Sequence, residues 1–118
     1  MDNTHDLPES PIEILLAQYA LLNKVLRSLP VPIAIPDPEE SGYTGPTVKG
    51  LEGGLDLLGL LPLREETRTA IEIAVLEWLT AHDVSLLGRD RRVVALALHR
   101  VAEAVNVAKI LVDHEHLD

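Results

Sequence analysis

The apolar residues of this chain recur at intervals of three and four along most of its length, which is the period of an α-helix and not of a β-strand. Four stretches carry this period: residues 10–29, 47–60, 63–82 and 89–113. There is no Phe, one Trp and two Tyr, so the core has to be built mainly from aliphatic side chains. Cores of this kind are typical of helices, because strands favour aromatic and β-branched residues. We therefore predict an all-α fold, a bundle of about four helices.

The connection between the first two predicted helices is rich in proline and glycine. Five prolines fall between residues 30 and 46. Proline lacks the backbone N–H and fixes φ, so neither a helix nor a central strand can run through this region. We predict an extended linker whose apolar part, Val31–Ile35, lies along a groove of its own domain or of a neighbouring chain. It is also the one stretch that could pair as a short strand.

Several residues mark where the predicted helices begin and end. Ser10 can cap the first helix with Pro11 at its first position, and Thr47 can cap the second. A turn over residues 83–88, with Asp83 and Gly88 as cap candidates, separates the third helix from the fourth. So short a connection predicts that these two helices are antiparallel neighbours.

Four glycines in the second predicted helix need a physical reason. Gly50, Gly53, Gly54 and Gly59 each cost a helix interior about 1 kcal/mol relative to alanine. Close approach of another element would explain them, as would a segment that is only partly helical. A phosphate-binding loop is disfavoured, because neither a preceding strand nor a Lys-Ser/Thr pair is present.

Length and composition narrow the domain organisation. A chain of 118 residues suits one domain, which we place at residues 10–113 between polar tails at 1–9 and 114–118. No apolar run approaches the 18–20 or so residues that span a bilayer, so no membrane contact is expected. The N-terminal residues lack the pattern of a signal peptide, which predicts a cytoplasmic location. Without cysteine, disulfides and thiolate metal sites are excluded, and no cofactor is expected.

The charge balance bears on possible partners. The net charge is −9, whereas nucleic-acid binders present basic surfaces that neutralise phosphates. Direct binding of nucleic acid is therefore not expected, although four arginines form a local basic cluster: Arg89, Arg91, Arg92 and Arg100. The same acidic charge suggests one alternative function, an acidic decoy that occupies a nucleic-acid-binding protein.

One pair of residues suggests a second alternative, which is catalytic. Arg92 and His99 are separated by six residues on one predicted helix, two turns apart on one face. This spacing resembles the Arg-x(4–6)-His pattern of HEPN-type helical ribonucleases. The resemblance implies a ribonuclease or toxin in which both residues act on an RNA phosphate near a dimer interface. The polar residue that usually follows the arginine in that family is absent, since Val93 stands there. The competing interpretation is a solvent-exposed polar stripe in which His99 pairs with Glu103.

Histidines near the C-terminus are the candidate metal ligands. His114 and His116 are suitable ligand types, but residues two apart do not face one way on a helix. They could converge only in an extended tail, so a solvated tail is the favoured interpretation and no metal site is predicted.

The last predicted helix is apolar around an unusually large part of its circumference. A helix of this kind is either central or covered on a second side by another chain. We therefore predict a non-enzymatic protein–protein interaction module, a self-associating adaptor or assembly component that forms a homodimer or a larger oligomer. Its partner is expected to be protein, first of all the chain itself. The expected interface residues are Val94, Leu98, Val101, Val105, Ala108, Val112, Ile33 and Ile35. The remaining alternative is a monomer that buries all of these side chains itself.

Overall fold

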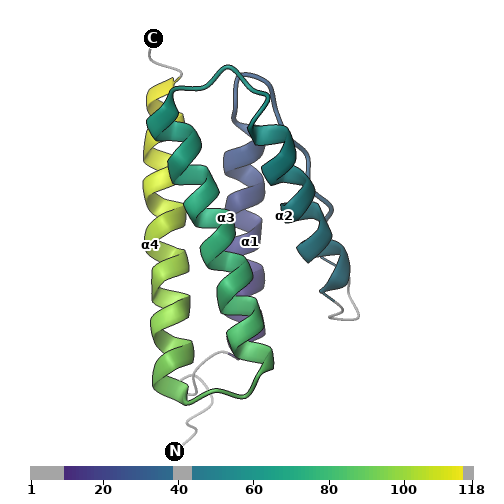
Figure 1. Cartoon of the computed structure of the whole chain (residues 1–118), viewed down its shortest axis with the longest axis vertical. Coiled ribbons are helices and arrows are strands. Elements are labelled where there is room, and N and C mark those ends of the chain that lie inside the picture. Colours follow the sequence, from purple (N-terminus) through teal and green to yellow (C-terminus); the bar gives the residue numbers. More distant parts are fainter. Residues whose placement is uncertain (1–9, 39–43, 116–118) are drawn as a thin grey trace, which may run out of the picture.

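A computed structural model describes residues 10–38 and 44–115 of the chain. The helices are α1 (Pro11–Arg27), α2 (Gly45–Leu58), α3 (Glu65–Leu86) and α4 (Arg91–Glu115). Within these described ranges no strand is present. The predicted all-α bundle of about four helices is confirmed (Figure 1).

Three of the helices form the centre of the fold. α1 contacts both α3 and α4, and α3 and α4 are the most extensively packed pair. These two run antiparallel, as the short turn between them predicts (Figure 1). α2 packs against α3 and lies on the opposite side of the bundle from α4. One side of α4 is therefore left without a neighbouring helix.

The ends of α1 and α3 follow from local side-chain chemistry. The hydroxyl of Ser10 accepts a hydrogen bond from the backbone N–H of Glu13 at 3.2 Å, so Ser10 caps α1 as expected. The prediction for the end of α3 was four residues short. Nothing between Asp83 and Leu86 breaks a helix, and α3 continues until Gly88, whose φ of 69° is the left-handed conformation that glycine adopts readily.

The start of α2 also differs from the prediction. The helix begins at Gly45 with Thr44 as its N-terminal flanking residue, two residues earlier than expected. Thr47 is buried inside the first turn and donates a hydrogen bond to the backbone carbonyl of Thr44 at 2.6 Å. At the other end, the guanidinium of Arg68 donates to the carbonyls of Leu58 at 3.4 Å and Leu61 at 2.5 Å. Arg68 thus adds a donor for the last carbonyl of α2, that of Leu58, and for the carbonyl of Leu61 in the turn that follows.

The proline-rich linker packs on its own domain and forms no strand. Ile33 and Ile35 are each only 4% exposed. The backbone N–H of Ile33 donates to the carbonyl of Leu26 at 3.0 Å, and the hydroxyl of Tyr19 donates to the carbonyl of Pro36 at 2.6 Å. These contacts hold the extended segment against α1, where α2 then covers it.

The close approach of the linker explains one of the four glycines of α2. A Cβ atom at Gly50 would lie 2.5 Å from Cδ of Pro36, closer than real side chains pack. A Cβ atom at Gly53 would meet nothing within 4 Å. Only Gly50 therefore needs to lack a side chain because of this contact.

These two glycines give a matched pair of substitutions. We expect Gly50→Ala to destabilise the fold by about 1–3 kcal/mol, because the rigid proline ring has to move. We expect Gly53→Ala to stabilise it by about 0.5–1 kcal/mol, because alanine is the better helix former and the site is open. Urea denaturation followed by circular dichroism measures both. Equal effects of the two substitutions would contradict the contact with Pro36.

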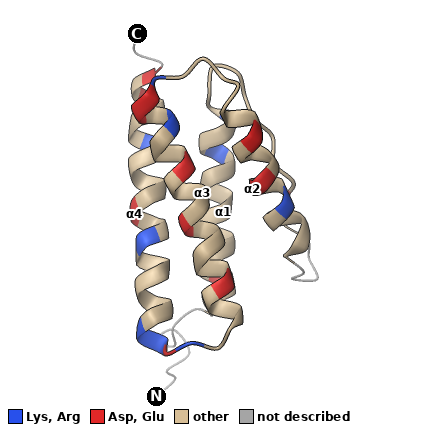
Figure 2. Ribbon diagram, viewed as in Figure 1, with Lys and Arg blue, Asp and Glu red and all other residues tan. Residues whose placement is uncertain are grey.

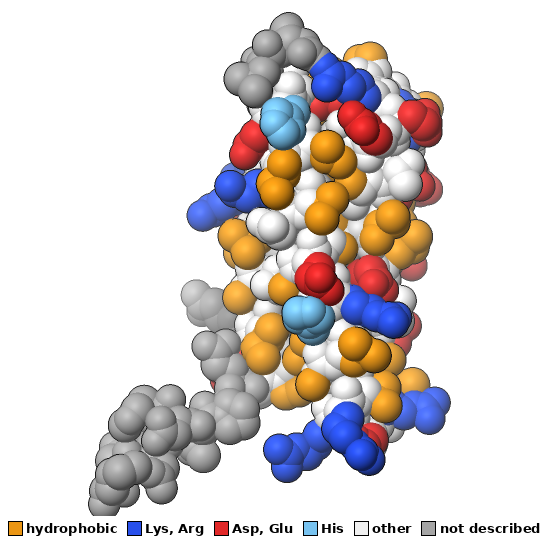
Figure 3. Space-filling model, turned by 90° about the vertical axis from the view of Figure 1, so that its left-hand side faces the viewer, with side chains coloured by type: hydrophobic (Ala, Val, Ile, Leu, Met, Phe, Trp, Pro, Cys, Tyr) orange, Lys and Arg blue, Asp and Glu red, His pale blue; other side chains and the backbone are white. Residues whose placement is uncertain are grey.

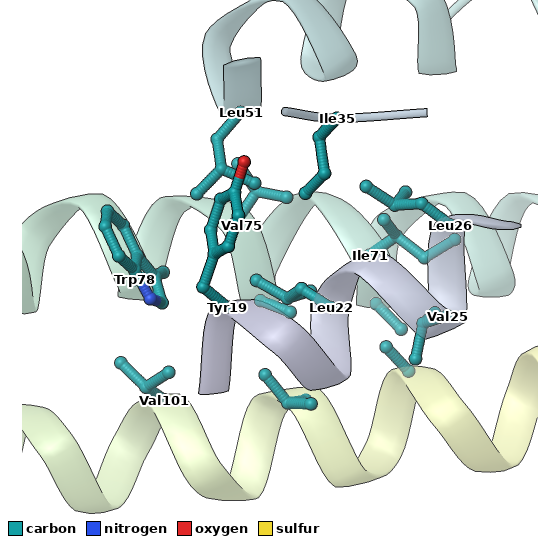
Figure 4. Close-up of a cluster of buried hydrophobic side chains, with 14 of the residues drawn as sticks. Tyr19, Leu22, Val25, Leu26, Ile35, Leu51, Ile71, Val75, Trp78 and Val101 are labelled. Atoms are coloured by element: carbon teal, nitrogen blue, oxygen red, sulfur yellow. The ribbon is translucent and has the colours of Figure 1, made fainter. Parts of the chain in front are cut away.

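The core is centred on the two largest buried side chains, Tyr19 of α1 and Trp78 of α3, both 0% exposed. Their ring centroids are 5.7 Å apart. The indole N–H of Trp78 donates to the backbone carbonyl of Leu15 at 2.7 Å. Figure 4 shows aliphatic side chains from every helix and from the linker around these two rings.

Candidate functional site

The inner face of α4 belongs to the core of its own chain. Val101, Val105, Ala108 and Val112 are between 0% and 2% exposed. Ile33 and Ile35 are buried as well, and Ile35 lies beside Gly54 of α2. Six of the eight residues expected at an interface are therefore covered within one chain and are not available to a partner. The helical period identifies a buried stripe, but it does not say whether the same chain or another one buries it.

The other two expected interface residues lie at one end of the bundle. Val94 and Leu98 are partly buried. They line a pocket of about 900 Å³ between the start of α1 and the start of α4, together with Pro11, Ile14, Ser85, Arg89, Asp90, Arg91, Arg92 and Ala95. The lining of this pocket combines aliphatic side chains, among them Ile14, Val94 and Leu98, with three arginines, Arg89, Arg91 and Arg92.

The outward face of α4 carries a second apolar stripe. Val93, Leu96, Val107 and Ile110 are each between 47% and 53% exposed. Together with the exposed residues Arg100, Glu103 and His114 they follow alternating steps of three and four, the heptad spacing of a helix that packs lengthwise on another. We call these seven residues the outer seam. Figure 3 shows hydrophobic side chains on this face above and below a central band of charged and histidine side chains.

A groove runs beside the outer seam, between α4 and α3. It has a volume of about 720 Å³ and an apolar floor of Ala70, Ile73, Ala104, Val107 and Leu111. Its rim is mostly acidic, and is formed by Glu65, Glu66, Glu77, Glu103, Thr69 and Arg100. The groove extends the apolar surface of the outer seam onto α3, where Ile73 is 49% exposed.

The sequence contained a signal for this surface. Leu96, Val107 and Ile110 lie off the buried stripe of the last helix, and with Val93 they form two pairs three residues apart that repeat after 14 residues, or two heptads. A helix with two separate stripes at this spacing has one to bury in its own fold and one left for another partner.

Arg92 is held by its own neighbour and not by His99. Both guanidinium nitrogens Nε and Nη2 donate to the carboxylate of Asp90 at 3.0 Å, and the backbone N–H of Arg92 donates to it at 2.8 Å. The side-chain hydrogen bonds come first in lowering the pKa of Asp90 and in raising that of Arg92. A phosphate would have to compete with this carboxylate for the guanidinium.

His99 lies further along the exposed face of α4. Its Nε2 atom is 3.1 Å from a carboxylate oxygen of Glu103, and both side chains are about two-thirds exposed. A separation of seven residues corresponds to about 10 Å along a helix. Arg92 lines the end pocket and His99 does not. One chain therefore does not bring the two candidate catalytic residues into one enclosed site.

His82 is the one buried histidine among the described residues, at 5% exposure. Its ring stacks on that of Trp78, with centroids 5.3 Å apart, and its Nε2 atom lies 2.7 Å from the hydroxyl of Thr44. These contacts tie the start of α2 to α3. His82 thus has a structural role in the core.

The structure describes one of the two candidate metal ligands, His114. Across residues 10–38 and 44–115, no three His, Cys, Asp or Glu side chains are grouped to hold a metal ion. His114 is exposed near the end of α4, and His116 lies outside the described residues.

Comparisons with family models, with curated proteins and with solved structures gave no match. No helix in the described part of the chain combines the length and the apolar character needed to cross a lipid bilayer.

Proposed function

We propose that this protein is a non-enzymatic protein–protein interaction module that associates with itself through the outer seam of α4 and the groove beside it. One observation carries the proposal: four aliphatic side chains on this face stay about half exposed at heptad spacing, although the chain has a complete core without them. Exposed apolar side chains that gather on one face are characteristic of surfaces that bind other proteins, and here two apolar pairs flank the charged residues Arg100 and Glu103.

The expected affinity is modest. Covering the exposed half of each aliphatic side chain contributes about 1 kcal/mol by its apolar area. Association itself costs several kcal/mol in lost translational and rotational freedom, about 4 or more by most estimates. Self-association should therefore depend on concentration, as expected of an adaptor that also exchanges partners.

The catalytic and decoy alternatives receive less support from this surface. Arg92 and His99 are not held together by one chain, and each is engaged by an acidic neighbour. The acidic residues are distributed over several helices (Figure 2). A cytoplasmic location remains part of the proposal, since a chain without cysteine has no disulfide that would require an oxidising compartment.

Light scattering over a range of about 10 µM to 1 mM tests the proposal. We expect the mass to rise with concentration, and the Leu96→Ser, Val107→Ser double variant to stay monomeric because it removes two apolar contacts per chain. Leu57→Ser is the matched control: Leu57 is 50% exposed against 53% for Leu96, but it lies on α2. A parent chain that remains monomeric throughout, or a control that loses self-association equally, would contradict the proposal.

A further inference from the structure

We propose that two copies of this chain pair through their outer seams as an antiparallel, two-fold dimer, with Arg100 of each copy against Glu103 of the other. This inference rests on the proposed function, because it assigns the partner and its orientation to the same surface. Both residues are exposed on the outward face of α4 and both line the groove beside α3.

Between Val93 and Ile110, the spacing of apolar and charged residues along the outer seam is the same from either end. Val93 precedes Arg100 by seven residues, and Ile110 follows Glu103 by seven. Leu96 precedes Arg100 by four, and Val107 follows Glu103 by four. When one helix is turned end to end against the other, Val93 therefore meets Ile110 and Leu96 meets Val107. A two-fold interface requires such self-complementarity, because each residue contacts a partner residue that in turn contacts its equivalent.

The central charges distinguish the two possible orientations. In heptad notation Val93, Arg100 and Val107 occupy one position of the repeat, and Leu96, Glu103 and Ile110 the other. In a parallel pair like positions face each other, so Arg100 meets Arg100 and Glu103 meets Glu103. In an antiparallel pair unlike positions face each other, so each Arg100 meets a Glu103. Like charges placed together at an interface oppose association, and opposite charges fix the register.

The charges at the two ends of α4 favour the same orientation. Arg91 and Arg92 are exposed where α4 begins, and Figure 2 colours the ribbon at that end blue for basic residues. Near the other end of α4 lie the exposed acids Asp113, Glu65 and Glu66, the last two lining the groove beside Leu111. Within the chain, Asp113 lies 3.8 Å from Lys109 and Glu65 lies 2.8 Å from Arg68. An antiparallel pair brings the basic end of each copy to the acidic end of the other. A basic end facing another basic end, as in a parallel pair, would be repulsive.

Cysteine crosslinking measures the orientation directly, because the parent chain contains no cysteine. Val93→Cys and Ile110→Cys are prepared separately, one of them labelled with ¹⁵N, then mixed and oxidised mildly. We expect a disulfide-linked mixed dimer and little crosslinking of either variant alone. In the antiparallel pair each position lies about 25 Å from its own counterpart, by the rise of about 1.5 Å per residue, which is too far for a disulfide. Self-crosslinking of Ile110→Cys without mixed crosslinking would overturn the inference.

Charge exchange gives a second, independent test. Arg100→Glu and Glu103→Arg are each expected to raise the dimer dissociation constant at least about tenfold, since each places like charges in contact. The double variant is expected to return to within about threefold of the parent. Circular dichroism checks that all variants stay folded, as expected at exposed sites. Failure of the double variant to recover would overturn the pairing of these two residues.

The two proposals fail in different ways. A parent chain that is monomeric at all concentrations overturns both, and would leave this face for a protein of different sequence. A concentration-dependent dimer in which Ile110→Cys crosslinks to itself supports self-association through this face but overturns the antiparallel seam.

Discussion

Trp78→Ala is expected to destabilise the protein by about 3–5 kcal/mol, the usual range for truncating a large aromatic side chain in a core. Trp78 is 0% exposed, its ring lies 5.3 Å from that of His82 and 5.7 Å from that of Tyr19, and it donates a hydrogen bond to Leu15. The substitution removes all three contacts at once. Because the free energy of unfolding of a single domain is only about 5–15 kcal/mol, this one substitution should remove a large part of it.

Urea denaturation monitored by circular dichroism measures this effect, since the variant has no tryptophan left to give fluorescence. Trp78→Phe is the matched control. It keeps a ring between Tyr19 and His82 but loses the hydrogen bond to the carbonyl of Leu15, so a smaller loss, of about 1–3 kcal/mol, is expected. Equal losses for the two variants would show that the hydrogen bond of Trp78 stabilises the core more than the packing of its ring does, contrary to this expectation.

The helices could be predicted from the sequence because their cause is local. Spacing of three and four identifies each helix, and the adjacent residues Ser10 and Pro11 mark the start of α1. The errors at Thr47 and Asp83 share a reason. Both residue types cap helices readily, but here Thr47 lies in the first turn of α2 and Asp83 lies inside α3. Thr47 and His82 are buried, and this burial is tertiary packing that the local sequence does not indicate.

The contacts between distant segments could not be predicted in this way. The hydrogen bond from Trp78 to Leu15 joins residues 63 apart, and that from Tyr19 to Pro36 joins residues 17 apart. Nothing in either local sequence indicates the other member of the pair. The same limit applies to α4, whose two apolar stripes are equally visible in the sequence. Only the placement of α1 and α3 shows that the stripe of Val101 is covered and the stripe of Leu96 is not.

The linker contact made by Tyr19 predicts that stability depends on pH in the alkaline range. Burial, followed in size by the negative charge of Asp37, raises the pKa of the Tyr19 hydroxyl to about 12 from its ordinary value of 10.0. The neutral hydroxyl donates to the carbonyl of Pro36, and an ionised one could not. The folded protein therefore binds this proton more tightly than the unfolded chain does.

The sign of the effect follows from that difference. Below about pH 10 the tyrosine is protonated in both states, and its contribution to stability is fully present. Between about pH 10 and 12 the unfolded chain loses the proton first, so the free energy of unfolding falls as the pH rises. The loss attributable to Tyr19 is at most about 3 kcal/mol, since one pKa unit corresponds to about 1.4 kcal/mol.

Comparison with Tyr19→Phe isolates this contribution from the lysines that also titrate in this range. The variant keeps the buried ring but has no hydroxyl, so it should be less stable than the parent at about pH 8, and the gap should narrow or reverse by about pH 12. Urea denaturation at intervals across this range measures both curves. A gap that stays constant would show that the pKa of the Tyr19 hydroxyl is the same in the folded protein as in the unfolded chain. The alkaline loss of stability would then have to be assigned to groups other than Tyr19.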